Sequence, residues 1–208
     1  MKYSFRAMVK EDLDQVNEID HEAFPTQWPP ANYKQELQNK IAYYLVACDT
    51  TRTVPSSPKT EKRHTGITTL LMPWKKEKAI VLPPSAAPQC VIAGFSGIWM
   101  MAGEAHVTNL AVKREYRGQG LGEYLLLATY DMAQAQNATF MTLEVRASNI
   151  VAQALYNKFG FMEMGVRKGY YLDNHEDAMI MSTEMLNSRV YQDKIQKLRE
   201  NLHKKFGG

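Results

Sequence analysis

Three glycines at alternate positions are the residues of this chain that most clearly indicate chemistry. Gly118, Gly120 and Gly122 lie in the stretch REYRGQGLGEYLL (114–126), between an apolar run and an apolar helical pattern. Glycine permits backbone torsions that other residues resist, and it lets a ligand approach the main chain closely. Successive N–H groups in such a stretch form an anion-binding concavity, to which a following helix adds its positive end. We therefore expect this stretch to bind a phosphate group.

Two well-known phosphate loops do not fit the glycine stretch. A Walker A loop requires Lys and then Ser or Thr after its last glycine, whereas Glu123 and Tyr124 follow here. The dinucleotide-binding fingerprint requires its third glycine at the position of Glu123. From these residues alone, a phosphate loop of another kind and a plain glycine-rich turn both remain open.

A second candidate is a carboxylate inside an otherwise apolar segment. Glu144 lies within FMTLEVRA, residues 140–147. A carboxylate in such a place is rarely without a partner. It could form an ion pair with a neighbour on the same face, for instance Arg146. It could instead act as a general base, since burial would raise its pKa toward a useful value.

Alternating and helical patterns predict the elements that position these residues. Strands are expected over 3–9, 41–48, 90–101, 104–116, 138–147, 160–172 and 176–186. Helices are expected over 10–24, 31–40, 120–137, 148–159 and 189–206. Strands interleaved with helices predict an α/β fold around one mixed sheet. The glycine stretch then connects a strand to a helix.

A proline-rich segment interrupts this pattern. Residues 49–89 hold six of the nine prolines, and we interpret them as an insertion into a hairpin whose arms are 41–48 and 90–101. That arrangement places Cys48 and Cys90 close together, and in a reducing cytosol we expect two buried free thiols. The predicted organisation is a domain over 1–186, interrupted at 49–89, followed by a basic amphipathic helix over 187–208.

Composition limits the classes of function. The chain has 208 residues, 45% of them hydrophobic, which suits one domain with a core. We expect no signal peptide, no membrane span and a cytoplasmic location. The scattered histidines predict no metal site. Net charge is +3, of which residues from 189 onward carry +4 and the rest −1. The body is therefore no nucleic-acid binder by charge, and we interpret the tail as a solvated helix lying on the domain, with an RNA contact as the alternative.

Three stretches together resemble a known family. YRGQGLG, LEVRASNIVAQALYNKFGF, and RKGYY followed by HEDAMIM resemble the GNAT acetyltransferases and, within them, the RimI branch. The resemblance is loose over 1–48 and close over 90–186. It implies the GNAT fold, acetyl-CoA as co-substrate without a metal, and transfer of acetyl to the N-terminal α-amine of a protein. In that branch the acceptor is a small-subunit ribosomal protein.

The resemblance also implies roles for individual residues. The CoA pyrophosphate would be held by Arg117, Gly118, Gln119, Gly120, Leu121 and Gly122. The pantetheine arm would lie along the backbone of Leu110, Ala111 and Val112. Asn149 would bond the CoA arm, and it is also placed to cap a helix.

For catalysis, the resemblance makes Glu144 the general base and Tyr156 the residue that protonates the leaving thiolate. Tyr156 could otherwise be a core aromatic residue. The candidate substrate-groove residues, each of which could equally be ordinary packing, are Phe24, Trp28, Tyr170 and Tyr171.

Two other functions remain open at this point. One is a GNAT enzyme that acts on a small amine or a lysine side chain, and the other is a non-catalytic CoA-binding module. The joint presence of Glu144 and Tyr156 argues against the module, because binding requires neither. An α-amine with a pKa near 8 is roughly one-tenth neutral at pH 7, whereas a lysine near 10.4 is far less so, and a single carboxylate base suits the easier amine.

Overall fold

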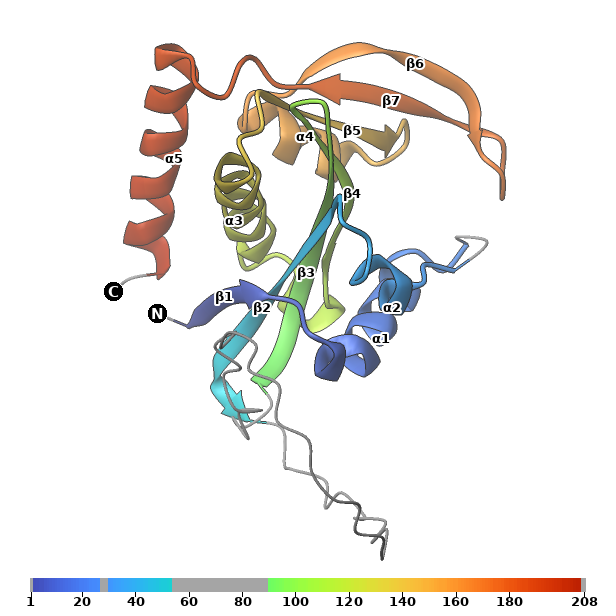
Figure 1. The fold of residues 1–208 in the computed structure, drawn as a ribbon, viewed down its shortest axis with the longest axis vertical. Helices are drawn as coiled ribbons and strands as arrows, with labels where there is room; N and C mark the ends of the chain where they lie inside the picture. Colours follow the sequence, from blue (N-terminus) through green and yellow to red (C-terminus); the bar gives the residue numbers. More distant parts are fainter. Residues whose placement is uncertain (1, 27–29, 54–89, 207–208) are drawn as a thin grey trace, which may run out of the picture.

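The computed structural model describes residues 2–26, 30–53 and 90–206, which form one mixed sheet flanked by helices (Figure 1). The strands are β1 (Tyr3–Ala7), β2 (Ala42–Thr53), β3 (Cys90–Met101), β4 (Glu104–Val112), β5 (Phe140–Arg146), β6 (Met162–Tyr171) and β7 (Glu176–Ser182). The helices are α1 (Leu13–Ala23), α2 (Tyr33–Glu36), α3 (Leu121–Ala135), α4 (Ile150–Lys158) and α5 (Arg189–Phe206). The predicted α/β fold around one mixed sheet is confirmed.

The strand order in the sheet is β1-β2-β3-β4-β5-β7-β6. Strands β1 to β4 are antiparallel neighbours, and so are β5, β7 and β6. Among the strands that the structure describes, only β4 and β5 are parallel, and helix α3 makes the crossover between them. The glycine stretch lies at the start of this crossover, as the sequence predicts.

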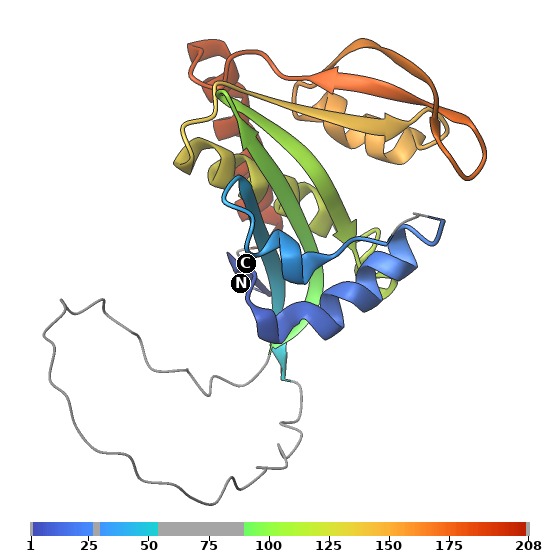
Figure 2. The same ribbon diagram turned by 45° about the vertical axis from the view of Figure 1, so that its right-hand side comes forward.

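Strands β4 and β5 separate after a short paired section. They pair only between Glu104–Val107 and Phe140–Leu143, after which β4 pairs with β3 alone and β5 with β7 alone. The register shift from Ile98↔Val107 to Gly97↔Asn109 makes Thr108 an extra residue of β4, and such a bulge bends a strand. Figure 2 shows the two strands diverging. The separation opens the sheet at the C-terminal ends of both strands.

Helices cover the two faces of the sheet unequally. Helices α3, α4 and α5 lie on one face and α1 with α2 on the other (Figures 1 and 2). The main core lies under the first group and includes Leu126 and Tyr130 of α3, Leu143 of β5 and Tyr191 of α5. The prediction that the tail helix lies on the domain is thus confirmed. No helix in the described ranges is long and apolar enough to cross a membrane.

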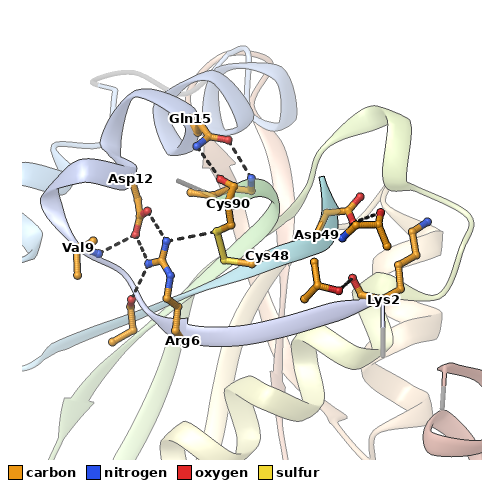
Figure 3. Close-up of a disulfide and its surroundings, with 12 residues drawn as sticks. Lys2, Arg6, Val9, Asp12, Gln15, Cys48, Asp49 and Cys90 are labelled. Atoms are coloured by element: carbon orange, nitrogen blue, oxygen red, sulfur yellow. Dashed lines mark hydrogen bonds and ion pairs between the residues drawn. A yellow bond between two sulfur atoms is a disulfide. The ribbon is translucent and has the colours of Figure 1, made fainter. Parts of the chain in front are cut away.

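The predicted hairpin is confirmed, but the predicted thiols are wrong. Strands β2 and β3 pair antiparallel, and β2 continues to Thr53, five residues beyond the expected end. Cys48 and Cys90 are close, as expected, but they form a disulfide, with Cα atoms 5.6 Å apart (Figure 3). The paired strands bring the two residues within the Cα separation that a disulfide requires. The rest of the predicted insertion, 54–89, lies outside the described residues.

Side chains from β1 and α1 lie beside the disulfide, and Arg6 Nη2 donates to Cys90 Sγ at 3.5 Å (Figure 3). Gln15 accepts from the Ile92 N–H at 2.9 Å and donates to the Cys90 carbonyl at 3.1 Å. Arg6 donates to both carboxylate oxygens of Asp12, at 2.6 and 2.7 Å. The start of β3 is therefore fixed by side-chain bonds as well as by strand pairing.

Reduction of the disulfide is expected to lower the free energy of unfolding by about 4 kcal/mol. The bond links residues 42 apart, and a loop of that length loses about this much unfolded-chain entropy when closed. Urea unfolding with and without a reductant measures the difference. The double variant Cys48→Ser/Cys90→Ser should show the lower stability and no response to reductant. Equal stability of the oxidised and reduced protein would contradict this expectation.

Candidate active site

The glycine stretch forms a tight connection from β4 to α3. Gly118 and Gly120 have φ angles of +73° and +89°, in the left-handed region that favours glycine. Helix α3 begins directly afterwards, at Leu121. None of the backbone N–H groups of residues 118–123 has an acceptor among the residues that the structure describes. Unpartnered N–H groups at a helix N-terminus fit a bound phosphate.

Side chains of the same stretch hold the loop in shape. The Arg117 Nε donates to the Val112 carbonyl at 2.8 Å, back to the end of β4. The Gln119 amide donates to the Glu115 carbonyl at 2.9 Å and accepts from Lys2 Nζ at 2.9 Å. The loop therefore presents its backbone, while these two side chains are engaged within the protein.

The end of β4 offers a second set of backbone groups. Leu110, Ala111 and Val112 pair with Ser96, Phe95 and Gly94 of β3. On their other side they have no pairing with β5, because the two strands have separated. A strand edge without a neighbour retains N–H and carbonyl groups for a ligand. This edge leads from the glycine stretch toward the point where β4 and β5 meet.

Glu144 lies on β5, and two basic side chains contact it. Its carboxylate is 3.0 Å from His106 Nε2 and 3.1 Å from Arg167 Nη1, and its side chain is only 9% exposed. The hydrogen bond from His106 is the main cause that lowers the pKa of Glu144, burial opposes it, and the Arg167 charge lowers it further. Burial acts in the expected direction, but the expectation that the pKa of Glu144 is raised overall is wrong. Opposite charges outweigh desolvation here.

The suggested ion pair between Glu144 and Arg146 is also wrong. The Arg146 guanidinium contacts Asp173 at 3.0 Å and Glu176 at 3.1 Å. It also donates to Thr26 Oγ1 at 3.3 Å and lies 3.8 Å from the centre of the Tyr171 ring. Arg146 thus joins the end of β5 to the β6–β7 turn and to the segment after α1.

His106 is a functional candidate that sequence reasoning missed. Its Nδ1 is 2.9 Å from Thr142 Oγ1, and the Thr142 hydroxyl donates to Glu104. A hydroxyl has one hydrogen, so the hydrogen between Nδ1 and Thr142 must come from the histidine. A carboxylate accepts hydrogen bonds, so Nε2, at 3.0 Å, is the donor to Glu144. The sequence showed only that a histidine lies on a predicted strand. The register His106↔Thr142 is what places this histidine beside Thr142 of β5.

Tyr156 and Asn149 both belong to α4. Tyr156 is buried in the main core, with its ring centroid 5.6 Å from that of Phe161, and burial raises its pKa to about 12. Asn149 caps the helix, since its Oδ1 accepts from the Ala152 N–H at 3.1 Å. The cap is confirmed, and the contacts of both residues with CoA stay predictions.

The substrate-groove candidates are spread over two segments. Tyr170 and Tyr171 end β6, with ring centroids 5.2 Å apart, and Tyr170 is exposed. Phe24 follows α1 and packs partly buried against the core on that face. Trp28 lies outside the described residues. Through Thr26 and Tyr171, Arg146 brings these segments together on the face of the sheet that carries Glu144.

Comparison with known proteins places the chain in a family. Residues 13–161 match the model of the Acetyltransferase (GNAT) family. The chain is a GNAT acetyltransferase. It is therefore an acyltransferase enzyme of a family that uses acetyl-CoA, and the alternative of a non-catalytic CoA-binding module is set aside.

Individual relatives agree with the resemblance to the RimI branch. A Bacillus subtilis (strain 168) protein with the provisional name ribosomal protein bS18-alanine N-acetyltransferase is 35% identical over 181 residues, which are 86% of this chain and 94% of the relative. The enzyme of that name from Escherichia coli (strain K12) is 41% identical over 93 residues, 44% and 63% of the two chains. The crystal structure of the E. coli ribosomal-protein-S18-alanine N-acetyltransferase has a TM-score of 0.61 at 23% identity and covers 90% of this GNAT chain and 97% of its own. The predicted GNAT fold is confirmed.

Proposed function

We propose that this enzyme transfers the acetyl group of acetyl-CoA to the N-terminal α-amine of a protein, with ribosomal protein bS18 as the substrate. The observation that carries the proposal is the Glu144–His106 pair, 3.0 Å apart, on the strands that border the opening of the sheet. The names of the relatives from B. subtilis and E. coli support this choice of substrate. We also propose a cytoplasmic location, although disulfides are uncommon there.

Acetyl-CoA fits the features between the glycine stretch and this pair. The unpartnered N–H groups of residues 118–123 would bind the pyrophosphate. The edge of β4 at Leu110, Ala111 and Val112 would hydrogen-bond to the amides of the pantetheine arm. The thioester would then lie where β4 and β5 separate.

The Glu144–His106 pair would act as the general base. Thr142 and Glu104 position His106, and His106 positions the Glu144 carboxylate, which would accept the proton from the amine. The neutral amine attacks the thioester carbon, a C–N bond forms, and the C–S bond breaks with release of CoA thiolate.

Tyr156 would interact with the departing sulfur. A phenol of pKa about 12 loses a proton to a thiolate near 8.5 at a cost of about 5 kcal/mol. Complete transfer from Tyr156 is therefore unfavourable without a change in its surroundings. A hydrogen bond from the phenol to the thiolate avoids this cost and still weakens the thiolate as a nucleophile.

A comparison of two amines tests the class of substrate. We expect acetylation of a peptide that begins with Ala, and a value of kcat/KM at least about 100-fold lower for the same peptide with a blocked N-terminus and one free internal lysine. The lysine amine is less often neutral at pH 7, and its long stem costs more entropy to order. Mass spectrometry after incubation with acetyl-CoA measures both rates.

Two controls separate the alternatives. Purified bS18 should gain one acetyl group at its N-terminus, and mass spectrometry of its tryptic peptides would locate this group. A ratio near one between the two peptides, or faster turnover of a polyamine, would reject the α-amine proposal and favour the small-amine or lysine alternative.

A further inference from the structure

Arg167 contacts the proposed base at the position that the substrate amine must reach. Its Nη1 is 3.1 Å from Glu144 Oε1, while His106 Nε2 is 3.0 Å from Oε2. Both oxygens of the carboxylate are therefore engaged before a substrate binds. An amine that gives its proton to this pair needs access to one of them.

Of the two residues that contact the Glu144 carboxylate, Arg167 is the one that a substrate can displace. Its side chain is 54% exposed, against 23% for His106. It lies on β6, the edge strand of the sheet, where the pairing with β7 is irregular after Arg167. His106 is fixed by the contact of its other ring nitrogen, Nδ1, with Thr142 Oγ1. An ion pair with one well-exposed member contributes about 1 kcal/mol or less, so its loss is small compared with substrate binding.

We propose that Arg167 is a displaceable partner of Glu144, which occupies the carboxylate oxygen until the substrate ammonium takes its place. This inference rests on the proposed function. The substrate ammonium replaces the Arg167 guanidinium beside Glu144, so the negative charge of the carboxylate stays balanced throughout the exchange. The Tyr170 ring already lies 5.5 Å from the guanidinium, so the side chain has a cation–π contact that does not depend on Glu144.

The two cations differ in what they can do at Glu144. A guanidinium does not lose its proton in a protein, so the resting pair is unreactive. An α-ammonium with a pKa near 8 can pass its proton to the Glu144–His106 pair and become the nucleophile. When the amine displaces Arg167, an unreactive ion pair with Glu144 is therefore replaced by one whose cation can lose its proton.

The charge of Arg167 also acts on the titration of the pair. Glu144 faces His106 from β4, Arg167 and Tyr171 from β6, and the apolar Ile180 from β7. Burial raises the pKa of Tyr171 to about 12, so it is neutral at working pH. Arg146, two residues along β5, is balanced by acidic partners of its own. Removal of Arg167 should make Glu144 easier to protonate, which moves the acidic limb of kcat/KM to higher pH.

The test compares Arg167→Gln and Arg167→Lys with the wild type on the Ala-peptide. Above the acidic limb, we expect Arg167→Gln to lower the KM for the peptide about threefold to fivefold, because a competing cation is gone. We expect its acidic limb to shift up by about half a pH unit to one unit. Arg167→Lys should stay close to the wild type. Lys168→Gln is the matched control, since Lys168 is paired with Asp177 instead.

Each outcome has one meaning. The melting temperature and the affinity for acetyl-CoA should be unchanged in every variant, because Arg167 is exposed and lies on the peptide side. A higher peptide KM in Arg167→Gln would show that Arg167 binds substrate, and an unmoved acidic limb would show that its charge does not act on Glu144; either result overturns the inference. Failure of the wild type to acetylate the peptide would reject the proposed function itself, and the inference with it.

Discussion

Glu144→Gln is expected to lower kcat by about 10²- to 10⁴-fold at pH 7, with no change in the affinity for acetyl-CoA. Glutamine keeps the shape of the side chain but cannot accept a proton. The residual rate should rise with pH, because an amine that is already neutral needs no base. Steady-state kinetics with the Ala-peptide and calorimetry with acetyl-CoA measure the two quantities.

The structure adds His106 to this prediction. Since His106 Nε2 lies 3.0 Å from the Glu144 carboxylate, the two should act as a unit. His106→Gln should then cause a loss of similar size, and the double variant should be little worse than either single one. Losses that multiply would show two independent roles.

A control variant with the same change of charge distinguishes a loss of catalysis from a general effect of the substitution on the protein. Glu163→Gln makes the same substitution on the exposed side of β6 and should leave kcat unchanged. If Glu144→Gln matches the wild type at pH 7, then Glu144 serves only to hold His106 and Arg167.

Gly120→Asp is expected to abolish measurable binding of acetyl-CoA. The new carboxylate would stand in the loop proposed to bind the pyrophosphate, and repulsion of 1–4 kcal/mol per charge pair weakens binding by about fivefold to 1000-fold. In addition, the φ angle of +89° at this position strains any residue with a side chain. Calorimetry measures affinity, and circular dichroism checks that the fold survives.

Two further glycine variants separate charge from strain. Gly118→Ala introduces a side chain at φ +73°, where a Cβ meets no atom within 4 Å, so it tests strain without charge. Gly165→Asp adds the same charge to β6, also in open space. We expect a small loss of affinity in the first and none in the second. Unchanged CoA affinity in Gly120→Asp would remove the glycine stretch from the site.

Features that depend on neighbours along the chain were predictable from the sequence. The bounds of β3, 90–101, are those expected, because a short apolar run that follows a proline-rich segment is typical of a buried strand. Gly118 and Gly120 adopt the torsions for which glycine was expected, and Asn149 caps α4. The motifs around these residues were enough to predict the GNAT fold. Local conformation is set by local sterics and hydrogen bonds, which a sequence carries directly.

Features that depend on strand register were decided by the tertiary structure. Residues i and i+2 of one strand are about 6.6 Å apart, whereas directly opposite residues on neighbouring strands are about 4.5–5.5 Å apart. Neither partner of Glu144 is directly opposite it, since His106 is opposite Thr142 and Arg167 lies on β6, beyond β7. Glu144 contacts both of them, and not Arg146 on its own strand, because of the way these strands align. The lowered pKa of Glu144 follows from those partners. The bond between Cys48 and Cys90 likewise depends on how β2 and β3 align, because only the paired strands bring residues 42 positions apart into contact.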